Sequence, residues 1–301
     1  AVCTGMAAMA LGSDGGGSIR YPAGLTGLVG LKPQGDRLPV GDEHASGWHG
    51  LLTLGPLTRS ARDAALFLEV TSNSMSPAPI DDPLHEPSRP LTIAVATNPP
   101  PGANVSLAPD GAAIIANCCE LLRELGHTVI DATVNYSRAS LWNTTVRFLK
   151  GVQHDVTSMP HHQQLERRTR NVARLGRLLP QRSLTGAIEH EQQLSAGLNA
   201  VFEHADILLT PLCESPAPPL STCPQRGAIR SLRQANTSAW LIPWNLTGQP
   251  AISIPTGLHK ARPTAIQLVA PHNDETTLLA LATQIEHRRP FPRLPHDSSQ
   301  S

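Results

Sequence analysis

The run GSDGGGSIR, residues 12–20, is the part of the sequence best suited to chemistry. Three glycines precede Ser18, so several backbone N–H groups can point toward one position near its hydroxyl, and no side chain blocks the approach of a carbonyl group. Fixed N–H donors beside a serine are what an oxyanion hole requires. By spacing alone, however, a flexible turn or an anion-binding loop would explain the glycines equally well.

Other motifs of catalytic or metal sites are absent from the sequence. There is no GxxxxGK[ST] phosphate-binding loop, and Arg20 occupies the second glycine position of a GxSxG elbow around Ser18. The 13 histidines include no HExxH motif. The pair His161 and His162 lies in a polar, helical region, which favours a solvated surface over a metal site. The sequence therefore predicts neither a metal nor a cofactor.

The elements around this run alternate between strand and helix patterns. The Ala-rich segment 1–11 predicts a buried helix that leads into the glycines. Residues 26–33 and 91–96 read as strands, and residues 60–71 as a helix capped by Ser60. A second helix should begin at a cap formed by Asp110 and end at Gly126, followed by a strand over 127–134. Because strand, helix and strand follow in this order, we expect a parallel crossover and an α/β fold.

The second half of the chain completes the predicted sheet. Residues 137–202 are rich in Arg, His and Gln and mostly helical in pattern, and residues 207–210, 250–255 and 265–270 read as strands. A closing helix is expected over 274–288. We predict an α/β/α sandwich with a central mixed sheet in one domain, residues 1–290, and a disordered tail at 291–301.

Composition excludes several functional classes. Lys plus Arg and Asp plus Glu both number 24, so the basic excess typical of nucleic-acid binding is missing. Five cysteines with no CxxC pair argue against a disulfide framework or a zinc site and favour the cytoplasm. No apolar run reaches the roughly 18 residues of a membrane span.

The glycine-rich run resembles the amidase signature, whose usual form is GSD, a small residue and GGSIR, followed by a proline and a later GLKP. Here the matching residues are Gly12 to Arg20, Pro22, and Gly30 to Pro33. Further segments are similar to the family in the family's order: GPLTRSARDAALFL, ADILLTP, NLTGQPAISIPTG, AIQLVAP and DETTLLALATQIE. The resemblance covers most of the chain except 137–202.

The resemblance implies an amidase that hydrolyses a carboxylic amide to an acid and ammonia or an amine. Members use a Ser–cis-Ser–Lys triad and an acyl-enzyme intermediate. By position, Ser18 is the nucleophile, and the N–H groups of Gly15, Gly16, Gly17 and Ser18 form the oxyanion hole. Asp14 and Arg20 are expected to support the loop through charge-assisted hydrogen bonds. The substrate is then a small-molecule amide, and a homodimer is an open possibility.

The sequence departs from the family before the signature. The family's triad lysine, and the GGSSGGS segment with the bridging serine, precede the signature, but nothing in the 17 residues before Ser18 matches them. Thr4 and Ser13 are the only hydroxyl residues there, and the first lysine is Lys32, within GLKP. We therefore expect a chain truncated at its N-terminal side relative to the family. Ser18 should then be open, with no lysine amine in reach and an exposed apolar groove beside residues 1–11.

Two alternatives follow from this departure. One is a catalytically inactive remnant or fragment of an amidase. The other is an A-type subunit of a glutamyl-tRNA amidotransferase, which shares the signature. If the chain is an amidase, its substrate choice should depend on residues 137–202, the part least like the family. Trp142, Phe148 and His154 are the candidates there.

Overall fold

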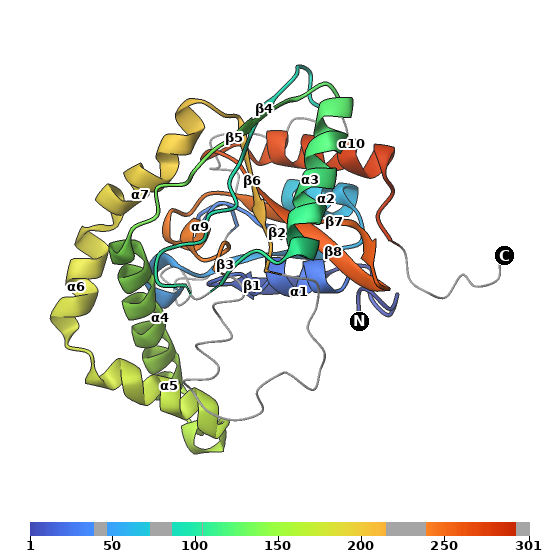
Figure 1. Cartoon of the computed structure of the whole chain (residues 1–301). Coiled ribbons are helices and arrows are strands. Elements are labelled where there is room, and N and C mark those ends of the chain that lie inside the picture. Colours follow the sequence, from blue (N-terminus) through green and yellow to red (C-terminus); the bar gives the residue numbers. More distant parts are fainter. Residues whose placement is uncertain (39–46, 73–85, 104, 215–238, 293–301) are drawn as a thin grey trace.

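The computed structural model describes residues 1–38, 47–72, 86–103, 105–214 and 239–292. These residues form one eight-stranded mixed sheet in the order β1-β3-β2-β7-β8-β6-β4-β5. Helices cover both of its faces (Figure 1). The predicted α/β/α sandwich with a central mixed sheet is confirmed.

The parallel part of the sheet consists of β4 (Thr92–Val95), β5 (Thr128–Asp131) and β6 (Ile207–Pro211). Ile93 pairs with Val129 on one side and with Ile207 on the other. Helix α3 (Pro109–Glu124) connects β4 to β5. This is the parallel strand–helix–strand crossover that the sequence predicts.

The antiparallel part contains β1 (Ala10–Asp14), β2 (Val29–Lys32) and β3 (Thr53–Thr58). The strands β7 (Ala251–His259) and β8 (Arg262–Val269) form a hairpin. Its two turn residues, Lys260 and Ala261, both have positive φ, of 50° and 61°. That conformation follows the right-handed twist of paired strands. The hairpin is longer than the two predicted strands and joins the two parts of the sheet.

Two helical layers enclose the sheet. One face carries α2 (Ala61–Thr71), α3 and α10 (Glu275–Arg288), whose apolar side chains pack with Leu31, Ile93, Ile252 and Leu268. The other face carries α1 (Arg20–Leu25), α9 (Pro243–Leu246) and the helices of region 137–202. The loop with Ser18 leads into this second layer.

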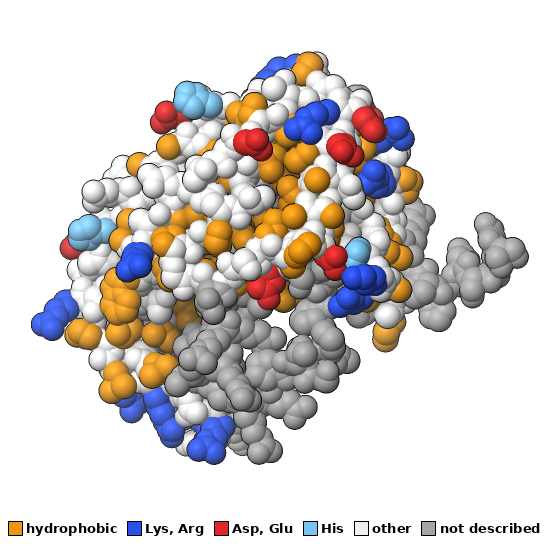
Figure 2. All heavy atoms as spheres, viewed as in Figure 1, with side chains coloured by type: hydrophobic (Ala, Val, Ile, Leu, Met, Phe, Trp, Pro, Cys, Tyr) orange, Lys and Arg blue, Asp and Glu red, His pale blue; other side chains and the backbone are white. Residues whose placement is uncertain are grey.

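Region 137–202 is helical, as predicted. It holds α4 (Arg138–Ser158), α5 (Arg167–Leu178), α6 (Gln181–Glu189) and α7 (Glu191–Asn199), and short 3₁₀ turns at His162–Gln164 and Ala200–Glu203. These helices extend to one side of the sheet (Figure 1). Basic side chains gather over α5 on the face shown in Figure 2, and acidic and basic side chains are mixed on the opposite side of that view. No helix in the described part of the chain is both long and apolar enough to span a membrane.

The prediction of a buried helix at residues 1–11 is wrong. These residues form turns and then enter β1, which pairs with β3 from Ala10 opposite Leu57 to Asp14 opposite Thr53. Helix propensity is a weak preference, and strand pairing overrides it here. Val2 is buried against Ala23 and Leu28, whereas Met6 and Leu11 are 82% and 62% exposed.

The predicted helix boundaries are partly correct. The Ser60 hydroxyl accepts a hydrogen bond from the N–H of Asp63 at 3.1 Å, so Ser60 caps α2. Asp110 does not cap α3, because the helix begins at Pro109 after the cap position Ala108. A proline at the first helical position needs no N–H partner. Asp110 lies in the first turn and forms an ion pair with Lys260.

Phe291, the first residue of the predicted disordered tail, is ordered and buried. Phe291 is 5% exposed and packs in the core with α10. Pro292 is half-buried, and residues 293–301 of the expected disordered tail lie outside the described residues.

Candidate active site

The loop of residues 15–19 is organised by the carboxylate of Asp14, the last residue of β1. Its oxygens accept hydrogen bonds from the N–H groups of Gly16 at 3.2 Å, Gly17 at 2.6 Å and Ile19 at 3.3 Å. The glycines allow the backbone to fold around the carboxylate, since Gly17 has φ of +113°. Asp14 therefore shapes the loop that carries Ser18.

Asp14 and Arg20 form a fully buried, bidentate ion pair. The Arg20 Nε lies 2.9 Å from Oδ2 of Asp14, and its Nη2 lies 2.9 Å from Oδ1. Burial alone would raise the pKa of Asp14, but the charge of Arg20, together with hydrogen bonds from Arg20, Asn245 and Gly17, holds that pKa well below its usual range. The carboxylate stays ionised, and it joins the N–H groups of the loop to the guanidinium of Arg20.

Two amide side chains extend this pair into a buried network. Arg20 donates from Nη2 to Oδ1 of Asn245 and from Nη1 to Oε1 of Gln267, both at 2.6 Å. Asn245 donates in turn to the backbone oxygens of Asp14 at 2.8 Å and Leu51 at 3.1 Å. Gln267 donates to the Thr210 hydroxyl at 2.8 Å. The network fixes the loop to α9, β6 and β8.

Asn245 and Gln267 were missed by our reading of the sequence. A signal for them exists. Gln267 is the single polar residue in the run AIQLVA, and Asn245 lies between Trp244 and Leu246 on a buried helical turn. A polar residue inside a buried apolar run needs a hydrogen-bond partner. Arg20 lies 247 residues away from Gln267 in the sequence. Only the folded structure shows that the two side chains are partners.

Ser18 is exposed and lies two residues before the start of α1. Of the four N–H groups predicted for an oxyanion hole, those of Gly16 and Gly17 donate to Asp14. Within the described residues, the N–H groups of Gly15 and Ser18 have no acceptor. These two N–H groups are therefore the ones available to a ligand.

Close packing holds the loop on three sides. A Cβ added at Gly15 would lie 2.6 Å from the ring of Trp48, and one at Gly17 would lie 2.6 Å from the Leu241 side chain. Gly16 has the Ile242 side chain at 3.7 Å from the same position. A side chain at Gly15 or Gly17 would therefore clash with its neighbours. At Gly17 the positive φ also disfavours any other residue.

Substituting Gly17 with alanine should lower the free energy of unfolding by at least about 1 kcal/mol, because the new Cβ meets Leu241 and the backbone conformation disfavours L-residues. Gly186 is a matched control: it lies inside α6, with nothing within 4 Å of an added Cβ. Gly186→Ala should raise the free energy of unfolding, since alanine favours helix. Urea unfolding monitored by circular dichroism measures both. Equal effects of the two substitutions would contradict this description of the loop.

The lysines all donate their hydrogen bonds away from Ser18. The amine of Lys32 donates to the backbone oxygen of Pro33, that of Lys150 to Gln153 and that of Lys260 to Asp110. Lys32 is fully buried, and burial, with a smaller effect of the Arg20 charge, lowers its pKa to about 7. Within the described residues no lysine amine hydrogen-bonds to Ser18.

The three residues proposed from the sequence to influence substrate choice differ in how they lie relative to the loop of residues 15–19. Phe148 packs edge-to-face on Trp48 with ring centroids 5.0 Å apart, and Trp48 in turn covers Gly15. Trp142 is 55% exposed, and His154 is also exposed. Phe148 is therefore linked to the loop through Trp48.

The α/β/α fold and the glycine-rich loop agree with the amidase signature that the sequence resembles. A family model described as Amidase matches residues 1–279, so the chain belongs to the amidase family. It is 37% identical over 295 residues to AmiB2 of Mycobacterium tuberculosis, a protein assigned as an amidase. AmiA2 of the same organism, assigned likewise, is 33% identical over 299 residues.

The chain spans less than two thirds of the length of these relatives. The match to AmiB2 covers 97% of the chain and 63% of AmiB2, and the match to AmiA2 covers 95% and 61%.

Solved structures share the fold. A 6-aminohexanoate cyclic dimer hydrolase superposes with a TM-score of 0.83 at 23% identity, covering 96% of the chain and 66% of that protein. A bacterial aryl acylamidase of the amidase signature family gives 0.77 at 22% identity, with coverages of 96% and 64%. A glutamyl-tRNA(Gln) amidotransferase subunit from Thermotoga maritima gives 0.74 at 22% identity, with coverages of 96% and 65%. At these identities the similarity concerns the fold.

Proposed function

We propose that Ser18 is the nucleophile of an amide hydrolase. Its oxygen attacks the carbonyl carbon of a carboxylic amide, and the tetrahedral intermediate expels ammonia or an amine to leave an acyl ester on Ser18. Water then attacks the ester and releases the carboxylic acid and the free serine. The 37% identity to AmiB2 supports this reaction class.

The observation that carries the proposal is the division of N–H groups in the loop. Asp14 accepts from Gly16 and Gly17, which fixes the backbone, while the N–H groups of Gly15 and Ser18 have no acceptor among the described residues. Two rigid donors next to an exposed hydroxyl can stabilise the negative charge that develops on the carbonyl oxygen. The oxyanion hole is thus proposed to consist of Gly15 and Ser18, with Gly16 and Gly17 in a supporting role.

Proton removal from Ser18 needs a base, because a serine hydroxyl is a weak nucleophile at neutral pH. In the family this base is a lysine that acts through a bridging serine. Here all three lysine amines have other hydrogen-bond partners. We propose that none of these three lysines deprotonates Ser18.

We therefore expect the 301-residue chain alone to release ammonia from hexanamide at the same negligible rate as its Ser18→Ala variant. A coupled ammonia assay at millimolar amide measures both rates. A clear rate in the chain that Ser18→Ala abolishes would keep the nucleophile but show that a base lies within these residues. A clear rate of hydrolysis that the chain and its Ser18→Ala variant share would contradict the assignment of Ser18.

A further inference from the structure

Helix α5 carries a row of arginines along one side. Its sequence, RRTRNVARLGRL, places four of them at positions i, i+3, i+7 and i+10: Arg167, Arg170, Arg174 and Arg177. At 3.6 residues per turn these positions share one side of the helix and extend over about 15 Å. These four residues are called the basic face of α5 below.

The basic face points away from the rest of the molecule. On the opposite side of α5, Val172 and Ala173 are buried and pack against apolar side chains of α4. Three of the four arginines are exposed, and Arg170 is half-buried. Basic side chains accordingly gather on the surface over this helix (Figure 2).

None of the four arginines forms an ion pair with another described residue. The ion pair at the start of α5 joins Glu166 to Arg168, which lies off the basic face, at 3.4 Å. Arg174 donates to the uncharged side chain of Asn171 at 3.1 Å. Residues 167–188 contain six arginines and neither aspartate nor glutamate, although the whole chain has a formal net charge of zero.

This concentration of charge is unfavourable in the free protein. Like charges three or four residues apart on a helix repel each other and destabilise it. An anionic partner that contacts several of the arginines would remove this repulsion. Arginine is well suited to a partner with phosphate groups, because its guanidinium can donate two parallel hydrogen bonds to one phosphate.

A large apolar side chain lies beside the basic face. Leu178, the last residue of α5, follows Arg174 by four positions and is therefore on the same side of the helix. Its side chain is 79% exposed. A purely ionic partner would leave this leucine in water, whereas the boundary between headgroups and acyl chains of a lipid bilayer would bury it.

Nucleic acids also carry repeated phosphates, but the sequence around α5 fits them less well. Proteins that bind single strands add aromatic side chains that stack on the bases. Residues 149–201, which include α5, contain no Phe, Tyr or Trp. The combination of arginines with an exposed leucine therefore favours a lipid surface.

We propose that the basic face of α5, together with Leu178, docks this protein on the surface of an anionic phospholipid bilayer. The helix lies along the surface, its arginines bind headgroup phosphates, and Leu178 enters the bilayer between them. The apolar side of α5 stays packed on α4, so docking does not require the helical region to unfold. The proposal does not depend on the role of Ser18.

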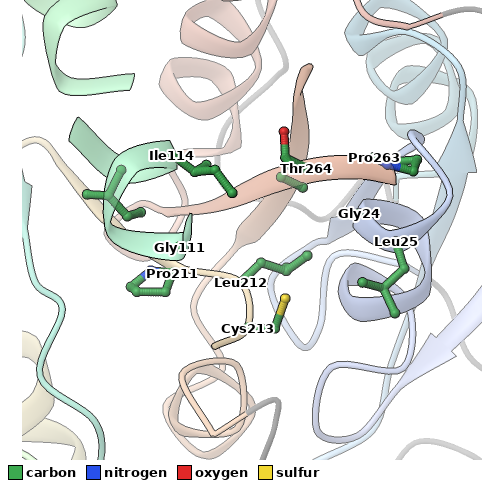
Figure 3. Close-up of a pocket in the computed structure, with 11 residues that line it drawn as sticks. Gly24, Leu25, Gly111, Ile114, Pro211, Leu212, Cys213, Pro263 and Thr264 are labelled. Atoms are coloured by element: carbon green, nitrogen blue, oxygen red, sulfur yellow. The ribbon is translucent and has the colours of Figure 1, made fainter. Parts of the chain in front are cut away.

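The hollow beside α1 is not an alternative site for a lipid. It is lined mainly by apolar residues of α1, α3, β8 and the segment after β6 (Figure 3). It has room for about one water molecule. An acyl chain does not fit there, and the contact with lipid is proposed to lie on the surface of α5.

Sedimentation of the 301-residue chain with lipid vesicles tests the proposal. Partition coefficients are compared for vesicles of phosphatidylcholine and for vesicles with about one third phosphatidylglycerol, at about 0.1 M salt. We expect at least about tenfold stronger partitioning into the anionic vesicles, because each arginine near an anionic surface contributes about fivefold. Raising the salt to about 0.5 M should weaken this binding.

A triple variant removes the exposed part of the basic face. Arg167→Gln, Arg174→Gln and Arg177→Gln together should lower partitioning into anionic vesicles at least about tenfold. Because these substitutions are on the surface and relieve repulsion, the urea midpoint of unfolding should stay the same or rise. The loss of binding would then not result from unfolding.

Two control variants match the change in charge and in apolar surface. Arg62→Gln, Arg123→Gln and Arg168→Gln together remove the same charge from exposed arginines outside the basic face, and should keep partitioning within about twofold. Leu178→Ser keeps the charge and should weaken partitioning about threefold to tenfold. Leu258→Ser, at a leucine that is 62% exposed on β7, should have no effect.

Several results would overturn the proposal. These are equal partitioning into the two kinds of vesicle, equal losses in the two triple variants, or parental binding by the Leu178→Ser variant. A fluorescent RNA oligonucleotide tests the other class of partner at the same salt concentration. RNA binding as strong as that of anionic vesicles, lost in the triple variant of the basic face, would assign this face to nucleic acid and overturn the lipid assignment.

Discussion

Replacing Ser18 with alanine in a chimera with AmiB2 should lower kcat/KM at least about 10³-fold, because the acyl ester can no longer form. In this chimera the chain replaces the matching segment of AmiB2. The chimera therefore keeps the segments of AmiB2 that have no counterpart in this chain. Hydrolysis of hexanamide, followed by ammonia release, gives the rates.

Ser13 is the matched control, since it is exposed on β1 in the same signature run. Ser13→Ala should retain kcat/KM within about threefold, as a surface substitution away from the reacting atoms does. The assignment is contradicted if the Ser18→Ala chimera keeps a tenth or more of the activity.

The Asp14→Asn variant should lose about 3 to 5 kcal/mol of unfolding free energy, because it leaves the Arg20 charge buried without its counterion. The loss should be measured by urea unfolding near pH 7. The pKa of Asp14 is lower in the folded than in the unfolded state, so its stabilising effect is present above the unfolded value. It is lost as the pH falls below about 4 toward the folded value. Asp14→Asn should therefore remove part of the acid sensitivity of the parent chain.

The same substitution at Asp206 provides the comparison. Asp206 pairs with Arg89, whose side chain is largely exposed, and such pairs contribute about 0 to 1 kcal/mol. Asp206→Asn should therefore have a small effect. If the two substitutions cost equally, the buried pair does not stabilise the loop as described.

Local patterns in the sequence were sufficient for much of the fold. The apolar stripe of α3, the Ser60 cap and the parallel β4–α3–β5 unit all follow from spacing within a few residues. Such features depend on interactions near in sequence, and the structure confirms them. The Ala-rich segment 1–11 shows the limit, since pairing of β1 with β3 about 40 residues later decides its conformation.

For the candidate site, the sequence indicated Asp14, Ser18 and Arg20 but not how the loop uses its N–H groups. A Gly-Gly-Gly-Ser run predicts several available donors, and only the fold shows two of them turned toward Asp14.

The most direct test of the central claim is mass spectrometry of the chimera after reaction with a fluorophosphonate probe. The account predicts one covalent adduct, on the peptide that contains Ser18, retained in Ser13→Ala and absent from Ser18→Ala. An adduct on a different residue, equal labelling of the Ser18→Ala chimera, or a folded chimera that hydrolyses hexanamide without an adduct at Ser18 would contradict it.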